Sequence, residues 1–124
     1  MREKLLILIV EDDKVFVQIL TEYLIFKGFR VVSSYYGIEA TSLAKKDKPD
    51  VIIIDIRLPD INGIEVIRQI RAIHMHKKTP IISFTGLISP DIHNNCITAG
   101  ADYHFTKPVG LPVLFEKIVE LLKS

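Results

Sequence analysis

Residues 51–60 read VIIIDIRLPD, a β-branched apolar run that ends at the acid Asp55 and is soon followed by a proline. Four consecutive β-branched residues are typical of a strand that is covered on both faces, as the strands of a parallel sheet are. Four further runs, two of them weaker and more polar, occupy residues 5–10, 30–34, 80–84 and 102–106. The sequence therefore predicts five strands.

Segments of helical periodicity alternate with these strands. The first helix is predicted from apolar residues at helical spacing, namely Phe16, Ile19, Leu20, Tyr23 and Leu24. Four more helices are expected around residues 40–44, 64–70, 90–99 and 112–122. Residues typical of helix ends mark several boundaries: Gly28, Asn62, Ser89, Pro90, Gly100 and Pro112. The alternation predicts a flavodoxin-like (βα)5 fold, a doubly wound parallel five-stranded sheet with strand order 2-1-3-4-5.

Length and charge limit the class of protein. With 124 residues, 48% of them hydrophobic, the chain fits one globular domain over residues 1–124, and no linker or repeat divides it. The net charge is +1, from 16 basic and 15 acidic residues. Because no broad cationic face is expected from this balance, direct binding to nucleic acid or to an anionic membrane is a poor first hypothesis.

The cellular compartment can also be inferred. Cys96 is the only cysteine, so neither an internal disulfide nor a thiolate zinc cluster can form, which favours a reducing cytoplasm. Arg2 and Lys4 precede an apolar run as in a signal peptide, but that run is short and ends in three acids. A membrane span needs about 20 apolar residues. We therefore expect a cytoplasmic protein without a membrane segment.

Polar side chains follow four of the five predicted strands. Glu11 and Asp12 follow the first strand, Asp55 the third, Thr85 the fourth and Lys107 the fifth. In an open parallel sheet, ligands bind outside the carboxyl ends of the strands, near the point where the strand order reverses. With the order 2-1-3-4-5, the first and third strands are neighbours, so the sequence predicts that three carboxylates converge.

Three converging carboxylates require positive charge, because each pair at 4 Å repels by about 4 kcal/mol at an effective dielectric near 20. Mg²⁺ suits such a cluster, since it takes oxygen ligands and is often held by one or two carboxylates together with phosphate. Lys107 supplies a second positive charge. The sequence thus indicates a Mg²⁺-dependent site for a phosphoryl group, with Asp55 as the nucleophile that forms an aspartyl phosphate.

Four sequence blocks together resemble the response-regulator receiver family, the CheY-like domains, over essentially the whole chain. They are residues 9–13 (IVEDD), residues 53–60 (IIDIRLPD) with Gly63, residues 82–86 (ISFTG), and Gly100-Ala101-Asp102 with Thr106-Lys107-Pro108. Each block alone would be weak. Four in this order, at predicted strand ends, make the resemblance specific.

The resemblance implies roles at the acidic cluster. Asp55 matches the phosphoacceptor, Asp12 the direct Mg²⁺ ligand, and Glu11 the acid that holds the metal through water. The backbone carbonyl of Arg57 matches a further ligand. The Arg57 side chain is unusual at this position, and we hypothesise that it affects how water reaches the acyl phosphate.

The resemblance also implies a switch. Thr85 matches the hydroxyl that moves toward the phosphoryl group, Lys107 the ammonium that contacts it, and the Lys107–Pro108 peptide is expected to be cis. His104 stands where the family usually has Tyr or Phe. We hypothesise that His104 takes this aromatic part, and imidazole would then make the signal sensitive to pH.

The resemblance further implies partners. The phosphoryl group would come from a sensor histidine kinase or a histidine phosphotransfer protein, and the chain would catalyse only its own phosphorylation and dephosphorylation. A downstream protein would read the state from the face of the fourth helix, fifth strand and fifth helix, including Ile92, His104 and Val113. We expect a monomer or a weak, phosphorylation-dependent dimer.

Two other functions remain open. A pseudo-receiver would keep the fold as a docking module without phosphorylation. A small enzyme, either an aspartyl phosphatase or a flavodoxin-like redox protein, is disfavoured: Arg57 stands where such a phosphatase has a second acid, and no flavin-phosphate loop follows the first strand.

Several polar residues have simpler interpretations. Asp13 is expected only to cap the first helix, and Cys96 only to pack. His74 and His76 are predicted to be exposed loop residues, because side chains two apart on a helix do not share a face.

Overall fold

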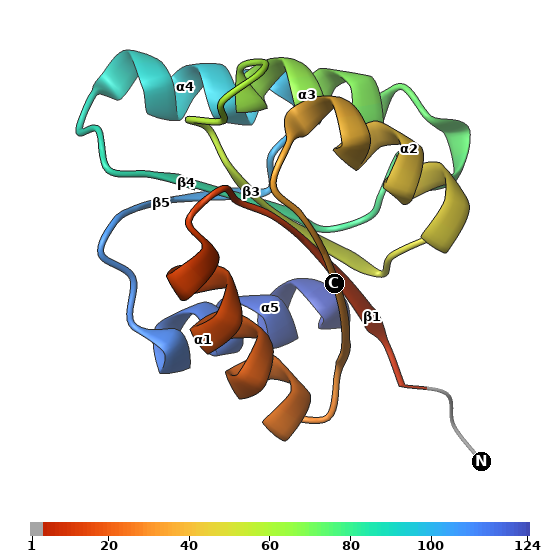
Figure 1. The fold of residues 1–124 in the computed structure, drawn as a ribbon. Helices are drawn as coiled ribbons and strands as arrows, with labels where there is room; N and C mark the ends of the chain where they lie inside the picture. Colours follow the sequence, from red (N-terminus) through yellow and green to blue (C-terminus); the bar gives the residue numbers. More distant parts are fainter. Residues whose placement is uncertain (1–3) are drawn as a thin grey trace.

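The computed structural model describes residues 4–124 and shows five parallel strands in one sheet (Figure 1). The strands are β1 (Leu6–Val10), β2 (Arg30–Ser34), β3 (Val51–Asp55), β4 (Ile81–Thr85) and β5 (Tyr103–Thr106). Their order is β2-β1-β3-β4-β5, which confirms the predicted topology. Arg2, which bears on the signal-peptide comparison, lies outside the described residues.

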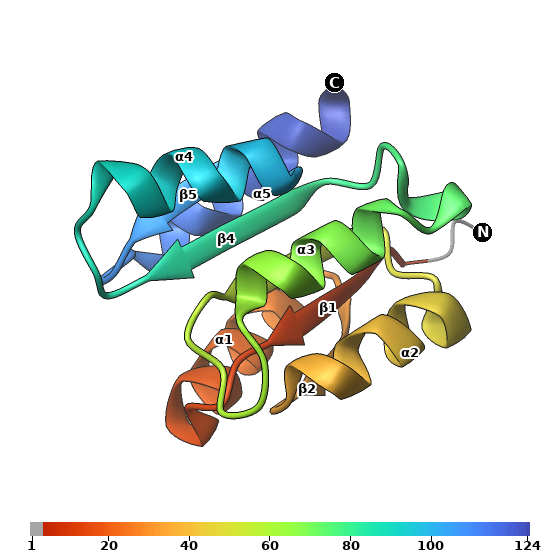
Figure 2. The same cartoon turned by 90° about the horizontal axis from the view of Figure 1, so that it is seen from above.

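The helices cover both faces of the sheet. They are α1 (Lys14–Phe26), α2 (Gly37–Asp47), α3 (Gly63–Arg71), α4 (Pro90–Ala99) and α5 (Leu111–Lys123), with a short 3₁₀ turn, η1 (His74–His76). Helices α1 and α5 lie on one face, and α2, α3 and α4 lie on the other (Figures 1 and 2). Asp13, Asn62 and Ser89 each accept a backbone hydrogen bond as N-caps, in agreement with the predicted boundaries.

Two hydrophobic cores result, one on each face. Strand residues alternate between them: Leu8 and Val10 of β1 pack under α2, α3 and α4, whereas Ile7 and Ile9 pack under α1 and α5. Cys96 is buried in the first core, as predicted. Because β1, β3 and β4 are buried along their whole length, their carboxyl ends are held rigidly at one edge of the sheet.

Helix α1 differs from its periodic pattern at one position. Ile19 is half exposed, whereas Val17, Leu20 and Leu24 are buried. Val17, Leu20 and Leu24 follow the three- and four-residue spacing of one helix face, and Ile19 points away from that face. The apolar spacing predicted the helix but not which of its apolar residues face the core.

The prediction that His76 is an exposed loop residue is wrong, although His74 is exposed. The His76 ring is buried, with Nε2 2.7 Å from the Ala44 carbonyl oxygen and Nδ1 2.8 Å from Thr79 Oγ1. The ring thereby ties the end of α2 to the segment before β4. Since Ala44 is 32 residues away in sequence, local spacing carried no sign of this contact.

Polar side chains also fix the amino edge of the sheet. Arg71 donates to the carbonyl oxygens of Gly100, at 2.6 Å, and Thr79, at 2.7 Å, and pairs with Asp102 at 3.1 Å. Asp50 Oδ2 accepts from the backbone N–H of Leu6 at 2.8 Å. These contacts join the segments that enter the strands.

None of the helices in residues 4–124 combines the length and the apolar character that crossing a membrane requires.

Candidate functional site

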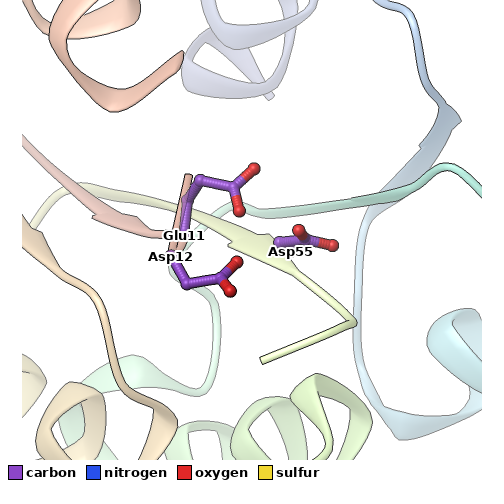
Figure 3. Close-up of side chains that lie close together, drawn as sticks. All are labelled: Glu11, Asp12 and Asp55. Carbon is purple, nitrogen blue, oxygen red and sulfur yellow. The ribbon is translucent and has the colours of Figure 1, made fainter. Parts of the chain in front are cut away.

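The three predicted acids meet at the carboxyl edge of the sheet. Glu11 and Asp12 directly follow β1, and Asp55 is the last residue of the neighbouring strand β3. One carboxylate oxygen from each lies within 4.8 Å of the others, and Figure 3 shows Glu11 and Asp12 pointing toward the side on which Asp55 lies. Glu11 is fully buried, Asp55 is 5% exposed, and Asp12 is exposed to solvent.

Lys107 brings positive charge to this cluster from the loop after β5. Its Nζ lies 2.6 Å from Glu11 Oε1 and 3.1 Å from Asp55 Oδ2. The ammonium also lies over the rings of Phe16, 5.3 Å from the centroid, and Phe84, 5.0 Å from the centroid. The Lys107–Pro108 peptide bond is cis, as the resemblance implied. Two carboxylates and two aromatic faces therefore hold the ammonium in place.

Burial and the neighbouring charges shift the pKa values of Glu11 and Lys107. Burial, reinforced by the adjacent Asp55, raises the pKa of Glu11 to about 7 despite the nearby Lys107. Burial alone would lower the pKa of Lys107, but the carboxylates of Glu11 and Asp55 raise it above its usual value. Glu11 therefore keeps its proton to a higher pH than an ordinary glutamate, while Lys107 stays charged at neutral pH.

The donor set fits a hard divalent cation. Every side-chain donor in the cluster is a carboxylate oxygen, and oxygen is the ligand that Mg²⁺ prefers. Asp55 Oδ1 accepts a hydrogen bond from the Arg57 backbone N–H at 3.1 Å, so the loop after β3 turns back toward the acid. Glu11, Asp12 and Asp55 could hold the ion, with the Arg57 carbonyl on the adjoining loop.

Thr85 ends β4 at the same edge and is fully buried. Its carbonyl accepts from the Lys107 N–H at 2.8 Å, and its hydroxyl accepts from the Leu87 N–H at 3.3 Å. Because Phe84 is in register with Asp55, Thr85 lies one residue further than Asp55 in the direction in which the strands run. The structure thus brings Glu11, Asp12, Asp55 and Lys107 together, and Thr85 ends the strand next to β3 at the same edge of the sheet.

Gly63 presses the first turn of α3 against the backbone of Asp55. A Cβ at position 63 would lie 2.5 Å from the Asp55 carbonyl oxygen and 2.7 Å from Ile56 Cα. The Gly63 N–H also donates to the Ile56 carbonyl at 2.8 Å. This position therefore requires glycine, which explains why the second sequence block extends to it.

His104 lies beneath α4, away from the acids. The ring is 7% exposed, and its Nδ1 is 2.7 Å from Ser83 Oγ, a buried residue two before Thr85. The ring of the exposed His93 meets it edge to face, with centroids 5.5 Å apart. Burial, followed by the charge on His93, lowers the pKa of His104. The sequence pointed to His104 but not to Ser83.

Asp60 is a second polar residue that the sequence did not single out. Its two carboxylate oxygens accept from the backbone N–H groups of Gly37, at 2.8 Å, and Ile38, at 2.9 Å. The partners are 23 and 22 residues away, and no local motif marks such a pairing.

Comparison with known proteins gives consistent relatives. The response regulator receiver domain family matches residues 7–119. The chain is 34% identical over 118 residues to a cyclic di-GMP phosphodiesterase of Thermotoga maritima, covering 95% of this chain and 31% of that protein. It is 32% identical over 117 residues to the response regulator MprA of Mycobacterium avium, covering 94% and 50%. The chain thus spans half or less of the length of these curated relatives.

Solved structures agree with this match. A CheY-like receiver domain protein of Methanospirillum hungatei superposes with a TM-score of 0.92 at 29% identity, covering 98% of this chain and 95% of that one. The receiver domain of the sensor histidine kinase PA1611 of Pseudomonas aeruginosa, solved with magnesium coordinated in its active-site cleft, gives a TM-score of 0.90 at 30% identity, covering 98% and 100%.

Proposed function

This chain belongs to the response regulator receiver domain family, and we propose that it is a phosphoacceptor switch in which Asp55 takes a phosphoryl group in a Mg²⁺-dependent reaction. The observation that carries the proposal is the contact of Lys107 Nζ with both Glu11, at 2.6 Å, and Asp55, at 3.1 Å, inside the acidic cluster. An ammonium and a cation-binding cluster beside one nucleophilic carboxylate are what phosphoryl transfer requires.

The proposed donor is a phosphohistidine on a sensor histidine kinase or a histidine phosphotransfer protein. A carboxylate oxygen of Asp55 attacks phosphorus, the P–N bond breaks, and the imidazole keeps the electron pair. The product is an acyl phosphate on Asp55, which water later hydrolyses. When bound, Mg²⁺ neutralises charge on the transferring group, and Glu11, Asp12, Asp55 and the Arg57 carbonyl would hold it.

The chain's own residues assist this step. Lys107 exchanges part of its contact with the two carboxylates for a phosphoryl oxygen, which retains its charge pairing. The Thr85 hydroxyl accepts from Leu87 N–H at 3.3 Å and has a proton free to donate to the phosphoryl group. Movement of Thr85 toward that group would break this long hydrogen bond and release residues 86–88.

The output is proposed to be a change in protein binding. A phosphoryl group adds about −1.5 to −2 charge and biases an existing equilibrium between two conformations. Residues 86–88 lead into α4, which covers His104, so the face of α4, β5 and α5 is the proposed surface for a downstream protein. On this proposal residues 1–124 act as one receiver unit, monomeric or weakly dimeric, in the cytoplasm, without direct nucleic-acid binding and with no chemistry beyond their own phosphorylation and dephosphorylation.

Intact mass measurement tests the proposal. The parent is incubated with acetyl phosphate, with and without Mg²⁺, beside Asp55→Ala and the control Asp91→Ala, whose exposed acid lies in the first turn of α4. We expect one phosphoryl increment on the parent and on Asp91→Ala only with Mg²⁺, and none on Asp55→Ala. An unmodified parent that leaves the donor intact would favour the pseudo-receiver, and an unmodified parent that rapidly consumes the donor would favour a phosphatase.

A further inference from the structure

We infer that Asp60 is a positioning residue of the proposed site, because its carboxylate ties the β3–α3 loop that carries Arg57 to the amino end of α2. The inference rests on the proposed function and names a residue outside the acidic cluster. Asp60 would act through the Arg57 backbone carbonyl, which adjoins the acceptor, and would not itself touch metal or phosphate.

The amino end of α2 lacks an acceptor of its own. Its N-cap, Tyr36, makes no side-chain cap hydrogen bond. Asp60 supplies that acceptor from the neighbouring loop, through Oδ1 to Gly37 N at 2.8 Å and Oδ2 to Ile38 N at 2.9 Å. A carboxylate is also favoured at this positive end of the helix dipole. Partial desolvation alone would raise the pKa of Asp60, but the hydrogen bonds from these N–H groups outweigh it and hold the pKa below its usual value. The Asp60 carboxylate therefore stays charged at neutral pH.

Close packing provides a second attachment at the same place. A Cβ on Gly37 would lie 2.7 Å from Ile61 Cγ1 and 3.2 Å from Leu58 Cδ1, both in the β3–α3 loop. The backbone of α2 and the loop are therefore in direct contact. Asp60 sits between Leu58 and Ile61 in sequence, so a polar and an apolar contact hold the loop at neighbouring points.

The turn that receives Asp60 also supports the other metal-facing segment. The Ser34 carbonyl accepts from the Glu11 N–H at 3.0 Å, and the Ser34 hydroxyl donates to the Tyr36 carbonyl at 2.7 Å. The Tyr36 N–H in turn donates to Ser34 Oγ at 3.2 Å. Residues 34–38 thus bond both to Glu11 and to Asp60 of the β3–α3 loop, so they link the two segments.

This support matters because Mg²⁺ demands nearly ideal octahedral geometry. A loop that moves by a fraction of an ångström misplaces the Arg57 carbonyl relative to Glu11, Asp12 and Asp55. Groups that orient the ligands of a metal ion typically change its affinity by about 10- to 100-fold when they are removed. Because Asp60 acts on a backbone ligand through three residues, we expect an effect near the lower limit, about 10-fold.

A purely structural role is the competing interpretation, in which Asp60 caps α2 and contributes to stability alone. The chain offers a matched control in Asp50, which also accepts a backbone N–H, from Leu6 at 2.8 Å, but at the opposite edge of the sheet. Loss of either acid removes a carboxylate–backbone contact. Only Asp60 lies on a loop that carries a proposed metal ligand.

Isothermal titration of Mg²⁺ into the parent, Asp60→Ala, Asp60→Asn and Asp50→Ala, with urea unfolding of each, is the test. We expect about 10-fold weaker Mg²⁺ binding for Asp60→Ala. Asp60→Asn should lie between that variant and the parent, since one amide oxygen can replace one of the two acceptors. Asp50→Ala should bind Mg²⁺ like the parent, even where it is less stable. The Mg²⁺ concentration for half-maximal phosphorylation by acetyl phosphate should rise by the same factor as the dissociation constant.

Equal affinity in the parent and both Asp60 variants overturns the inference and leaves the proposed function standing, provided that the parent binds Mg²⁺ and is phosphorylated. An equal loss of affinity in Asp50→Ala also overturns it, because general loosening would then explain both variants. A parent that neither binds Mg²⁺ nor accepts phosphate overturns the proposed function, and this inference with it. If Asp60→Ala does not fold, the comparison of Asp60→Asn with the parent decides by the same criteria.

Discussion

Charged side chains at the two edges of the sheet have different surroundings. At the amino edge, Arg71 donates to backbone carbonyls of Gly100 and Thr79 and pairs with Asp102, and Asp102 in turn accepts from the Ile81 N–H at 2.9 Å. Arg71 and Asp102 are therefore each paired with fixed partners. Among the described residues no buried side-chain nitrogen or oxygen lacks a hydrogen bond, so these contacts leave no other buried polar side chain unpaired.

At the carboxyl edge, Glu11 and Asp55 share the ammonium of Lys107, and Asp12 belongs to the same acidic cluster. Burial raises the pKa of Glu11 to about 7. This excess of negative charge is unfavourable in the absence of a cation. The comparison teaches that the same fold uses polar residues for stability at one edge and keeps an unbalanced cluster, suited to binding, at the other. Substitutions at the amino edge should therefore lower the stability of the fold, and substitutions at the carboxyl edge should lower the rate of phosphorylation.

The largest effect is expected for Lys107→Ala. Loss of a preorganised donor to a transferring group typically costs about 1,000-fold in rate, or about 4 kcal/mol in the barrier. We expect that loss in the rate of phosphorylation by acetyl phosphate, measured by intact mass over time. Lys46→Ala, an exposed lysine in the last turn of α2, is the control and should react at the parental rate. A small effect of Lys107→Ala would remove the basis for assigning function to the carboxyl edge.

Arg71→Ala tests the amino edge. Several carbonyls and Asp102 would lose a charged donor, and we expect a loss of about 3 kcal/mol in the free energy of unfolding. Urea denaturation measures this loss. The phosphorylation rate at a temperature where the variant is folded should stay at the parental value, and a strongly reduced rate would contradict the division between the edges.

Glu11 predicts a pH dependence that is specific to the carboxyl edge. Its pKa is about 7 in the folded protein and 4.5 ordinarily, so the folded state binds the proton more tightly than the unfolded chain. The stability of the metal-free protein should therefore fall as the pH rises from about 4.5 to 7, by about 3 kcal/mol. Glu11→Gln should remove this slope, measured by urea unfolding at several pH values. Saturating Mg²⁺ should reduce the slope in the parent.

His104 and His76 extend the comparison to two buried histidines. His76 has a hydrogen-bond partner at each ring nitrogen, whereas His104 meets Ser83 at its Nδ1. Burial lowers the pKa of His104, so the stability that it contributes should be lost as the pH falls below 6.5. His104→Tyr should flatten that acid loss and leave phosphorylation intact. The ring-proton resonances of His104, followed by NMR, should show that it titrates below pH 6.5. A titration at the usual pH of a histidine would contradict the predicted lowering of its pKa by burial.

The smallest effect is expected for Arg57→Ala. If the exposed Arg57 side chain limits the approach of water to the acyl phosphate, its removal should shorten the lifetime of phosphorylated Asp55 by roughly threefold. Decay of the phosphorylated mass after removal of the donor measures that lifetime. An unchanged lifetime would restrict the contribution of Arg57 to its backbone.

The fold could be predicted because the decisive signals are local. Four β-branched residues before Asp55 identify a buried strand, and the alternation with helices restricts the sheet to few topologies. Glu11, Asp12, Thr85 and Lys107 could be placed for the same reason, because each stands where an apolar run ends and parallel strands end at one edge.

The remainder depends on contacts between distant segments. The burial of His76 could not be predicted from its neighbours in sequence, because its ring bonds to the carbonyl of Ala44 in α2, 32 residues away. Asp60 was missed because it bonds to backbone N–H groups, which every residue except proline has, so the partner leaves no mark in the sequence. Side chains that meet the backbone of another element can be found only once the tertiary packing is known.

Gly63 has a consequence for anyone who would rebuild this domain to accept a different input. Even the methyl group of alanine at position 63 would lie 2.5 Å from the carbonyl oxygen of Asp55. Any residue other than glycine there would therefore displace the backbone of the acceptor. Designers can diversify the exposed loops around the cluster in a library, but position 63 should be kept invariant. Conversely, alanine at that one position offers an engineered off state in which every chemically reactive side chain is still present.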